Sequence, residues 1–113
     1  MSLTVTVVGT GRIGSTLARA WRDARMDVRL ASRAPQQREL DGILLTRIDE
    51  ALPGSEVVVT AIPGPAVGAF LDEHADALTV IPLVDVSNTV GGSAMHHAAG
   101  AGALAYYRAF NTL

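Results

Sequence analysis

The stretch Leu3-Thr-Val-Thr-Val-Val-Gly9-Thr-Gly-Arg-Ile-Gly14 decides the fold, because it joins an uncharged, β-branched run to three closely spaced glycines. Such a run is typical of a strand buried on both faces, and it stops at Gly9. A helix should follow, with apolar residues at helical spacing. These are Ile13, Leu17, Ala20, Trp21 and Ala24. A second strand over residues 27–31 then closes a βαβ unit of about thirty residues.

Each glycine of this G-x-G-x-x-G pattern has its own predicted role. Gly9 permits a tight turn, Gly11 lets the backbone approach a pyrophosphate, and Gly14 lets the helix pack closely on the strand. The free N–H groups and the dipole at the helix N-terminus favour the anion. The competing interpretation is a turn whose glycines are purely structural. A P-loop is rejected, because Ser15 follows the last glycine and the sequence contains no lysine.

The same alternation of strands and helical segments continues along the chain. We expect strands over 43–46, 57–62, 78–86 and 104–110, a helical turn over 49–52, and helices over 65–77 and 93–99. Pro82 would be tolerated only at a sheet edge or bulge. The fold class is therefore α/β, with a doubly wound, mostly parallel, Rossmann-like sheet in three layers. Residues 1–113 would form a single dinucleotide-binding domain.

Composition excludes several classes of function. The 113 residues are 49% hydrophobic with a net charge of -2, and their nine basic residues are scattered arginines, which argues against nucleic-acid binding. Without cysteine there is no disulfide framework or cysteine-bound zinc, and the adjacent His96 and His97 make poor joint metal ligands. Proline and glycine interrupt the longest apolar stretch, residues 57–71, so we expect a cytoplasmic chain that does not enter membranes.

The end of the second strand predicts which dinucleotide binds. An NAD site places a carboxylate there for the ribose 2′-OH, whereas this strand ends in Ser32-Arg33. Ser32 can donate a hydrogen bond to a 2′-phosphate, and Arg33 can pair with the phosphate and stack on adenine. Arg38 is a second candidate cation. The pattern favours NADP(H), the alternative being that Arg33 is an ordinary solvated arginine.

Two further turns should border the nicotinamide half of the crevice. The turn Pro63-Gly64-Pro65 follows the strand over 57–62, so it should face the glycine loop at the switch point of the sheet. Asn88 follows the next strand and could meet the nicotinamide ribose or carboxamide, although asparagine is equally common in turns for conformational reasons. No residue stands out as catalytic, and hydride transfer between stacked rings needs positioning more than an acid or base.

Five segments together resemble the coenzyme F420-dependent NADP oxidoreductases. They are Thr4-Val-Thr-Val-Val-Gly9-Thr-Gly-Arg-Ile-Gly14, Ser32-Arg33, Ala61-Ile-Pro-Gly-Pro65, Asp85-Val-Ser-Asn88 and Arg108-Ala-Phe-Asn-Thr112. Members of that family pass a hydride between NADP(H) and an 8-hydroxy-5-deazaflavin. The resemblance implies that Thr10, Arg12 and Ile13 line the pyrophosphate and nicotinamide side. It also implies that Ser32 and Arg33 hold the 2′-phosphate while Ile62 and Pro63 pack near the nicotinamide.

The sequence departs from that family in two places. Members often carry another basic residue where Gln36 and Gln37 stand, and they continue past the Asn-Thr ending into a helical region that this sequence lacks. Two hypotheses remain, an NADP(H)-dependent oxidoreductase with coenzyme F420 or a similar small-molecule redox substrate, and a non-catalytic NADP(H) sensor acting through partners. We also expect a homodimer or other self-association through apolar residues of the last strand, namely Leu104, Tyr106 and Phe110.

Overall fold

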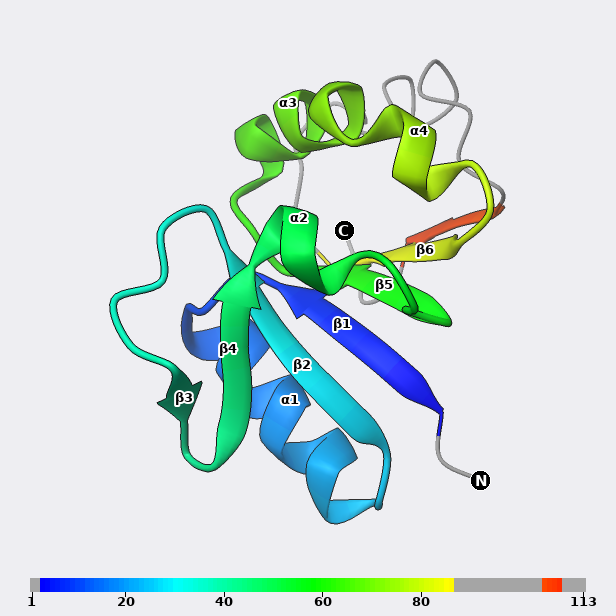
Figure 1. The fold of residues 1–113 in the computed structure, drawn as a ribbon. Coiled ribbons are helices and arrows are strands. Elements are labelled where there is room, and N and C mark those ends of the chain that lie inside the picture. The colour runs from blue at the N-terminus through cyan, green and yellow to red at the C-terminus, as the bar shows by residue number, and fades with distance from the viewer. Residues whose placement is uncertain (1–2, 87–104, 109–113) are drawn as a thin grey trace.

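The computed structural model describes residues 3–86 and the backbone of residues 105–108, and it contains a seven-stranded sheet in the order β3-β4-β2-β1-β5-β6-β7 (Figure 1). The strands are β1 Thr4–Val8, β2 Asp27–Ser32, β3 Glu39–Leu40, β4 Ile43–Arg47, β5 Val57–Thr60, β6 Pro82–Asp85 and β7 Ala105–Arg108. Every neighbouring pair is parallel except β3 with β4. The predicted mostly parallel, Rossmann-like sheet is confirmed.

Helices cover both faces of this sheet, which gives the predicted three layers. The helices are α1 Arg12–Asp23, α2 Ile48–Ala51, α3 Gly64–Glu73 and α4 Ala75–Leu78. One buried cluster joins Ala18 of α1 to Val7 and Leu30, and another joins Val67 of α3 to Val8 and neighbouring strand residues. Figure 1 shows α1 on one side of the sheet and the other three helices on the opposite side. Successive side chains of a strand point to opposite faces, so β1 contributes to both clusters.

The face that α1 turns to the sheet differs from the predicted apolar stripe. Its buried residues are Gly14, Ser15 and Ala18, whereas Ile13 is 56% exposed and Ala20 and Ala24 are also exposed. Leu17 and Trp21 are partly buried against the cluster on this face. Close approach of the helix to the sheet at Gly14 leaves room only for small side chains, and Ile13 therefore lies at the surface beside the end of β5.

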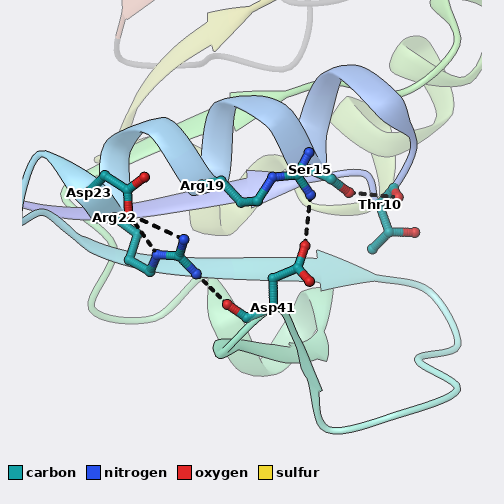
Figure 2. A network of polar contacts seen from close by, with 6 residues as sticks. All are labelled: Thr10, Ser15, Arg19, Arg22, Asp23 and Asp41. Atoms are coloured by element: carbon teal, nitrogen blue, oxygen red, sulfur yellow. Dashed lines mark hydrogen bonds and ion pairs between the residues drawn. The ribbon is translucent and has the colours of Figure 1, made fainter.

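The short strand β3 is a feature that the sequence analysis missed. It forms an antiparallel hairpin with β4, and the turn residues Asp41 and Gly42 both have positive φ angles, 53° and 79°. Arg19 of α1 donates to the Asp41 carboxylate at 2.7 Å, and Arg22 donates to the Asp41 carbonyl oxygen (Figure 2). These two contacts fasten the hairpin to α1. The strand predicted over 43–46 is confirmed as β4.

Two predicted boundaries between α3 and β6 were wrong. The helix expected over 65–77 is interrupted at His74, whose φ of -116° is not helical, so that α3 and α4 are separate. The strand expected over 78–86 begins only at Pro82, because Leu78 belongs to α4. Pro82 lies in an inner strand rather than at an edge or bulge. It is accommodated as the first residue of that strand.

The remaining expectations fall partly outside the described residues. The helix predicted over 93–99 and the residues at both ends of the strand predicted over 104–110 lie there, while β7 occupies the middle of that strand. Asn88, Leu104 and Phe110 also lie outside the described residues. Within residues 3–86 and 105–108, no helix has the length and apolar character needed to cross a membrane.

Candidate functional site: a dinucleotide crevice

The crevice lies where the strand order reverses, at the carboxyl ends of β1 and β5. After β1 the chain adds β2 and then β4 on one side of β1. It then crosses back and adds β5 on the other side of β1. Gly9 donates its N–H to the Ala31 carbonyl at 2.9 Å, and Ala61 donates to the Val8 carbonyl at 2.8 Å. These bonds join the carboxyl ends of β1 and β2 to the residues that directly follow β1 and β5. Ligands of open α/β sheets bind at this kind of switch point.

Two of the three glycines are required by the packing of the protein itself. Gly9 has a φ of +121°, and a Cβ placed there would collide with the Ala61 carbonyl oxygen. A Cβ at Gly14 would collide with the Gly9 carbonyl oxygen, because the first turn of α1 lies directly against the loop. The predicted roles of Gly9 in the turn and of Gly14 in close packing agree with this geometry.

Gly11 is different, because a Cβ there would meet no protein atom within 4 Å. Its φ of -72° is open to any residue, so neither packing nor backbone conformation explains a glycine at this position. The space above Gly11 is therefore left for something outside the described residues. A pyrophosphate lying against the backbone fits this space and the three-glycine pattern.

The N-terminus of α1 is exposed to this space and carries no competing acidic group. Gly11 is the N-cap, no side chain caps the helix, and the first turn contains no acidic residue. Ser15 donates its hydroxyl proton to the Thr10 carbonyl at 3.0 Å and thereby holds the loop against the helix (Figure 2). The unpaired N–H groups of the first turn can donate to an anion.

Ser32 and Arg33 follow directly at the end of β2. The Ser32 hydroxyl accepts a hydrogen bond from the Ala34 N–H at 3.2 Å, so its proton remains available to donate. Arg33 is exposed, and the ion pairs found among the described residues do not include it. Arg47, which lines a neighbouring hollow together with Arg33, is paired with Asp49 at 3.2 Å. Arg33 is thus a cation free to pair with a bound anion.

An apolar cavity of about 380 Å³ connects these groups to α3. One end is formed by Gly9, Thr10, Gly11, Ser32 and Arg33. Its walls are mainly apolar and include the last residues of α3. These further lining residues are Val8, Ala31, Ile48, Ile62, Pro63, Ala66, Phe70, Glu73 and His74. A cavity of this size and polarity is suited to a flat organic group that carries a charge at one end.

Two further hollows adjoin the cavity. One of about 410 Å³ is lined by Arg12, Ile13, residues 61–64 and Val86, so it lies on the β5 side of the glycine loop. The other, about 320 Å³, lies between the glycine loop and the segment after β2, where Thr10 and Ser32 meet residues 34–37. Most of the predicted site residues therefore line this cavity or one of the two hollows beside it.

Two predicted site residues are not brought into the crevice. Arg38 lines a hollow beside β4 together with Leu44 and Thr46. This hollow shares residues 35–37 and Leu45 with the hollow at Thr10 and Ser32, so Arg38 lies next to the crevice without lining it. The Arg38 carbonyl accepts the Leu45 N–H at 2.8 Å. Gly14 is buried behind the loop and acts through packing. Asn88 lies outside the described residues.

The sequence analysis missed the wall that α3 contributes. Pro63, Ala66, Phe70 and Glu73 recur at intervals of three or four residues, which places them on one face of a helix. That spacing was visible in the sequence. The sequence does not show that this face borders the crevice, because the side on which a helix packs is decided by the tertiary structure.

Comparison with solved structures agrees with this architecture. An NAD-dependent formate dehydrogenase from Staphylococcus aureus, solved with NAD, is 21% identical with a TM-score of 0.67, over 95% of this chain and 34% of that one. A D-isomer specific 2-hydroxyacid dehydrogenase from Xanthobacter autotrophicus Py2, solved with NADPH, is 24% identical with a TM-score of 0.66, over 94% and 36%. This chain thus spans about a third of the length of both dehydrogenases.

A third structure is closer in length. The TrkA-N domain of the inner membrane protein YbaL from Escherichia coli is 15% identical with a TM-score of 0.70, over 96% of this chain and 89% of that one. At these identities the three likenesses establish the fold alone. No curated protein sequence matches the chain.

A family model is more informative, because it matches residues 1–74 of the 113 in the chain. It is described as the NAD binding domain of D-isomer specific 2-hydroxyacid dehydrogenases. The coarser sequence prediction, a Rossmann-type domain of the nicotinamide-dependent oxidoreductases, is confirmed, whereas the match does not extend to the F420-dependent family. This chain belongs to the NAD-binding-domain family of the D-isomer specific 2-hydroxyacid dehydrogenases.

Proposed function

We propose that this chain is the dinucleotide-binding domain of an oxidoreductase and that it prefers NADP(H) to NAD(H). One similar structure was solved with NADPH and another with NAD, so these comparisons do not indicate which cofactor this chain prefers. We therefore base the preference on the residues at the end of β2. The main supporting observation is that Ser32 and Arg33 stand there, with no carboxylate in the sequence between Asp27 and Glu39. The ion pairs among the described residues do not include Arg33. A carboxylate would repel the 2′-phosphate, whereas a guanidinium attracts it.

Each part of the crevice suits one part of the dinucleotide. The apolar cavity beside α3 accepts the adenine, and the glycine loop with the open space at Gly11 accepts the pyrophosphate. The hollow at Thr10 and Ser32 accepts the 2′-phosphate. Arg33 follows Ser32 directly and lines the adjoining cavity, and its long side chain pairs with the phosphate from there. The hollow at Ile13 and residues 61–64 accepts the nicotinamide, and Asn88 remains a candidate for its ribose or carboxamide.

The residues of the nicotinamide hollow position a ring and keep water from one of its faces. When bound, the nicotinamide supplies the hydride-transfer chemistry. Ile13 and Ile62 present apolar surface to the hollow, and Arg12 is the single ionisable residue among its described lining. This part of the chain can therefore orient a ring and exclude water, whereas proton transfer to a second substrate would need groups from elsewhere.

The proposal has two forms, which differ in the second substrate. A deazaflavin acceptor such as coenzyme F420 follows from the sequence resemblance and suits a hollow without an acid or base. A 2-hydroxy acid follows from the family description. NADPH oxidation assayed with a deazaflavin and with short 2-oxo acids distinguishes them. Tight binding without turnover of either would favour the non-catalytic sensor.

The NADP(H) preference is tested by calorimetry with NADPH and NADH on the wild-type chain and on Arg33→Ala, Ser32→Ala and Arg19→Ala. We expect NADPH to bind at least about tenfold more tightly than NADH, because charge-assisted hydrogen bonds to the phosphate contribute roughly 1.5–3 kcal/mol each. Most of the preference should disappear in Arg33→Ala and less in Ser32→Ala.

Arg19→Ala is the matched control, since it removes the same charge from a residue that pairs with Asp41 away from the crevice. Its cofactor preference should equal that of the wild-type chain. Equal affinities of the wild-type chain for both cofactors, or a preference that survives in Arg33→Ala, would refute the assignment of Arg33.

A further inference from the structure

A hollow of about 320 Å³ beside the adenine cavity is lined mainly by charged side chains. Its lining residues are Arg33, Arg47, Ile48, Asp49, Glu73 and His74. Four of them, Arg33 and Glu73 among them, also line the cavity itself. Arg33 directly follows β2 and Glu73 is the last residue of α3. The fold therefore brings a cation and an anion from distant parts of the sequence to one hollow.

The other two charges of this hollow are paired with each other. Nε of Arg47 lies 3.2 Å from Oδ1 of Asp49. Arg33 takes part in none of the ion pairs among the described residues. Glu73 contacts its neighbour His74, at 3.2 Å between Oε2 and Nε2. A carboxylate has two oxygens, so this contact leaves Oε1 able to accept from a guanidinium.

Glu73 is held at the mouth of the hollow, whereas Arg33 can turn. The His74 side chain is only 14% exposed, and its ring packs on Phe70 at a centroid distance of 5.2 Å. This packing fixes the partner of Glu73. Arg33 is exposed, and its long side chain is flexible. Its guanidinium can therefore approach Glu73 or move away from it.

The 2′-phosphate draws Arg33 in the other direction. Neither Arg33 nor Glu73 lines the hollow assigned to this phosphate, at Thr10 and Ser32. A guanidinium that extends toward the phosphate thus leaves the hollow that it shares with Glu73. We infer that Glu73 competes with the 2′-phosphate for Arg33 and thereby limits the preference for NADP(H). This inference rests on the proposed function and adds to it a second residue that sets the cofactor specificity.

The test measures the ratio of NADPH to NADH affinity by calorimetry on the wild-type chain and on Glu73→Gln. We expect this ratio to rise about two- to fivefold in the variant, the range expected when an exposed ion pair is lost. Both cofactors carry the same adenine, so any contact between residue 73 and the base cancels in the ratio. Damage to the fold would lower the affinity for NADPH rather than raise it.

A double variant shows whether Glu73 acts through Arg33. In the Arg33→Ala background, Glu73→Gln should change the ratio by less than about 1.5-fold, because the group for which the two anions compete is gone. Direct repulsion between Glu73 and the phosphate would persist in that background. Asp72→Asn is the matched control, since it makes the same charge change on the adjacent exposed residue, which lines neither the cavity nor this hollow. Its ratio should equal that of the wild-type chain.

Three outcomes would overturn the inference alone. They are an unchanged or lower ratio in Glu73→Gln, a rise of the same size in the Arg33→Ala background, and an equal rise in Asp72→Asn. Each of them leaves the proposed function intact if the wild-type chain prefers NADPH and loses that preference in Arg33→Ala. A wild-type chain that binds neither cofactor, or both equally, would overturn the proposed function and this inference together.

Discussion

Alanine substitution at two glycines of the same loop should affect two different properties. Gly14→Ala should lower the stability of the fold, whereas Gly11→Ala should lower the affinity for NADPH. In Gly14→Ala the new Cβ would overlap the Gly9 carbonyl oxygen, a backbone atom that cannot rotate away, so α1 and the loop must separate. Overpacking of this kind costs about 1–3 kcal/mol or more. The gain from replacing glycine within a helix offsets about 0.5–1 kcal/mol. We expect a net loss of about 2 kcal/mol in the free energy of unfolding.

Gly11→Ala should leave stability almost unchanged. Its Cβ meets no protein atom within 4 Å and its φ is -72°, so the new side chain is accommodated without strain. Alanine is a clearly poorer N-cap than glycine, by about 1 kcal/mol, but it reduces the entropy of the unfolded chain by about 0.4–1 kcal/mol, so the net change in stability stays within about 1 kcal/mol. The methyl group would instead occupy the space assigned to the pyrophosphate. NADPH affinity should therefore fall by at least about tenfold in a fully folded protein.

Urea unfolding followed by circular dichroism and by the fluorescence of Trp21, the sole tryptophan, measures the stability of both variants. A loss of about 2 kcal/mol moves the midpoint of Gly14→Ala by about 1 M for a slope near 2 kcal/mol/M. Calorimetry with NADPH completes the comparison. A Gly14→Ala variant as stable as the wild-type chain would refute the packing argument. A Gly11→Ala variant that binds NADPH normally would refute the location of the pyrophosphate.

Three further outcomes are expected. Gly42→Ala forces a residue with a side chain to adopt a φ of +79°, so it should lose about 1 kcal/mol or more in urea unfolding, unlike a substitution at an ordinary turn position. Arg19→Ala breaks an ion pair whose side chains are 43% and 52% exposed, and it should change stability by less than about 1 kcal/mol in the same assay. We also expect the chain to self-associate, so sedimentation equilibrium should give a mass above 11.8 kDa that rises with concentration; a clean monomer at high concentration would contradict this.

The sequence predicted most reliably those features that depend on local chemistry. An uncharged β-branched run followed by Gly9 and Gly14 admits few structures, because a strand, a tight turn and a closely packed helix satisfy all of these residues at once. The β3 hairpin could also have been predicted, since Asp41-Gly42 is a strong signal for a two-residue hairpin turn. It was missed because only two residues precede that turn in strand conformation.

Features that depend on tertiary contacts could not be predicted. The apolar pattern continues across His74, so a break of one residue between α3 and α4 leaves no trace in the periodicity. Arg38 is close to Ser32 in sequence, but it directly precedes β3 and lines the hollow beside β4 instead. Glu73 is far from the glycine loop in sequence, and it reaches the crevice only because α3 packs beside β5 with that face inward.

The most direct test of the central claim is a titration of the ¹⁵N-labelled chain with NADPH, followed by two-dimensional NMR of the backbone amides. We predict saturable shifts at Gly9, Gly11, Ser32 and Arg33 and along the inner face of α3, with little change at Gly42 in the β3–β4 turn. An absence of saturable shifts, or shifts centred on the β3–β4 turn that spare Gly9, Gly11, Ser32 and Arg33, would contradict the account.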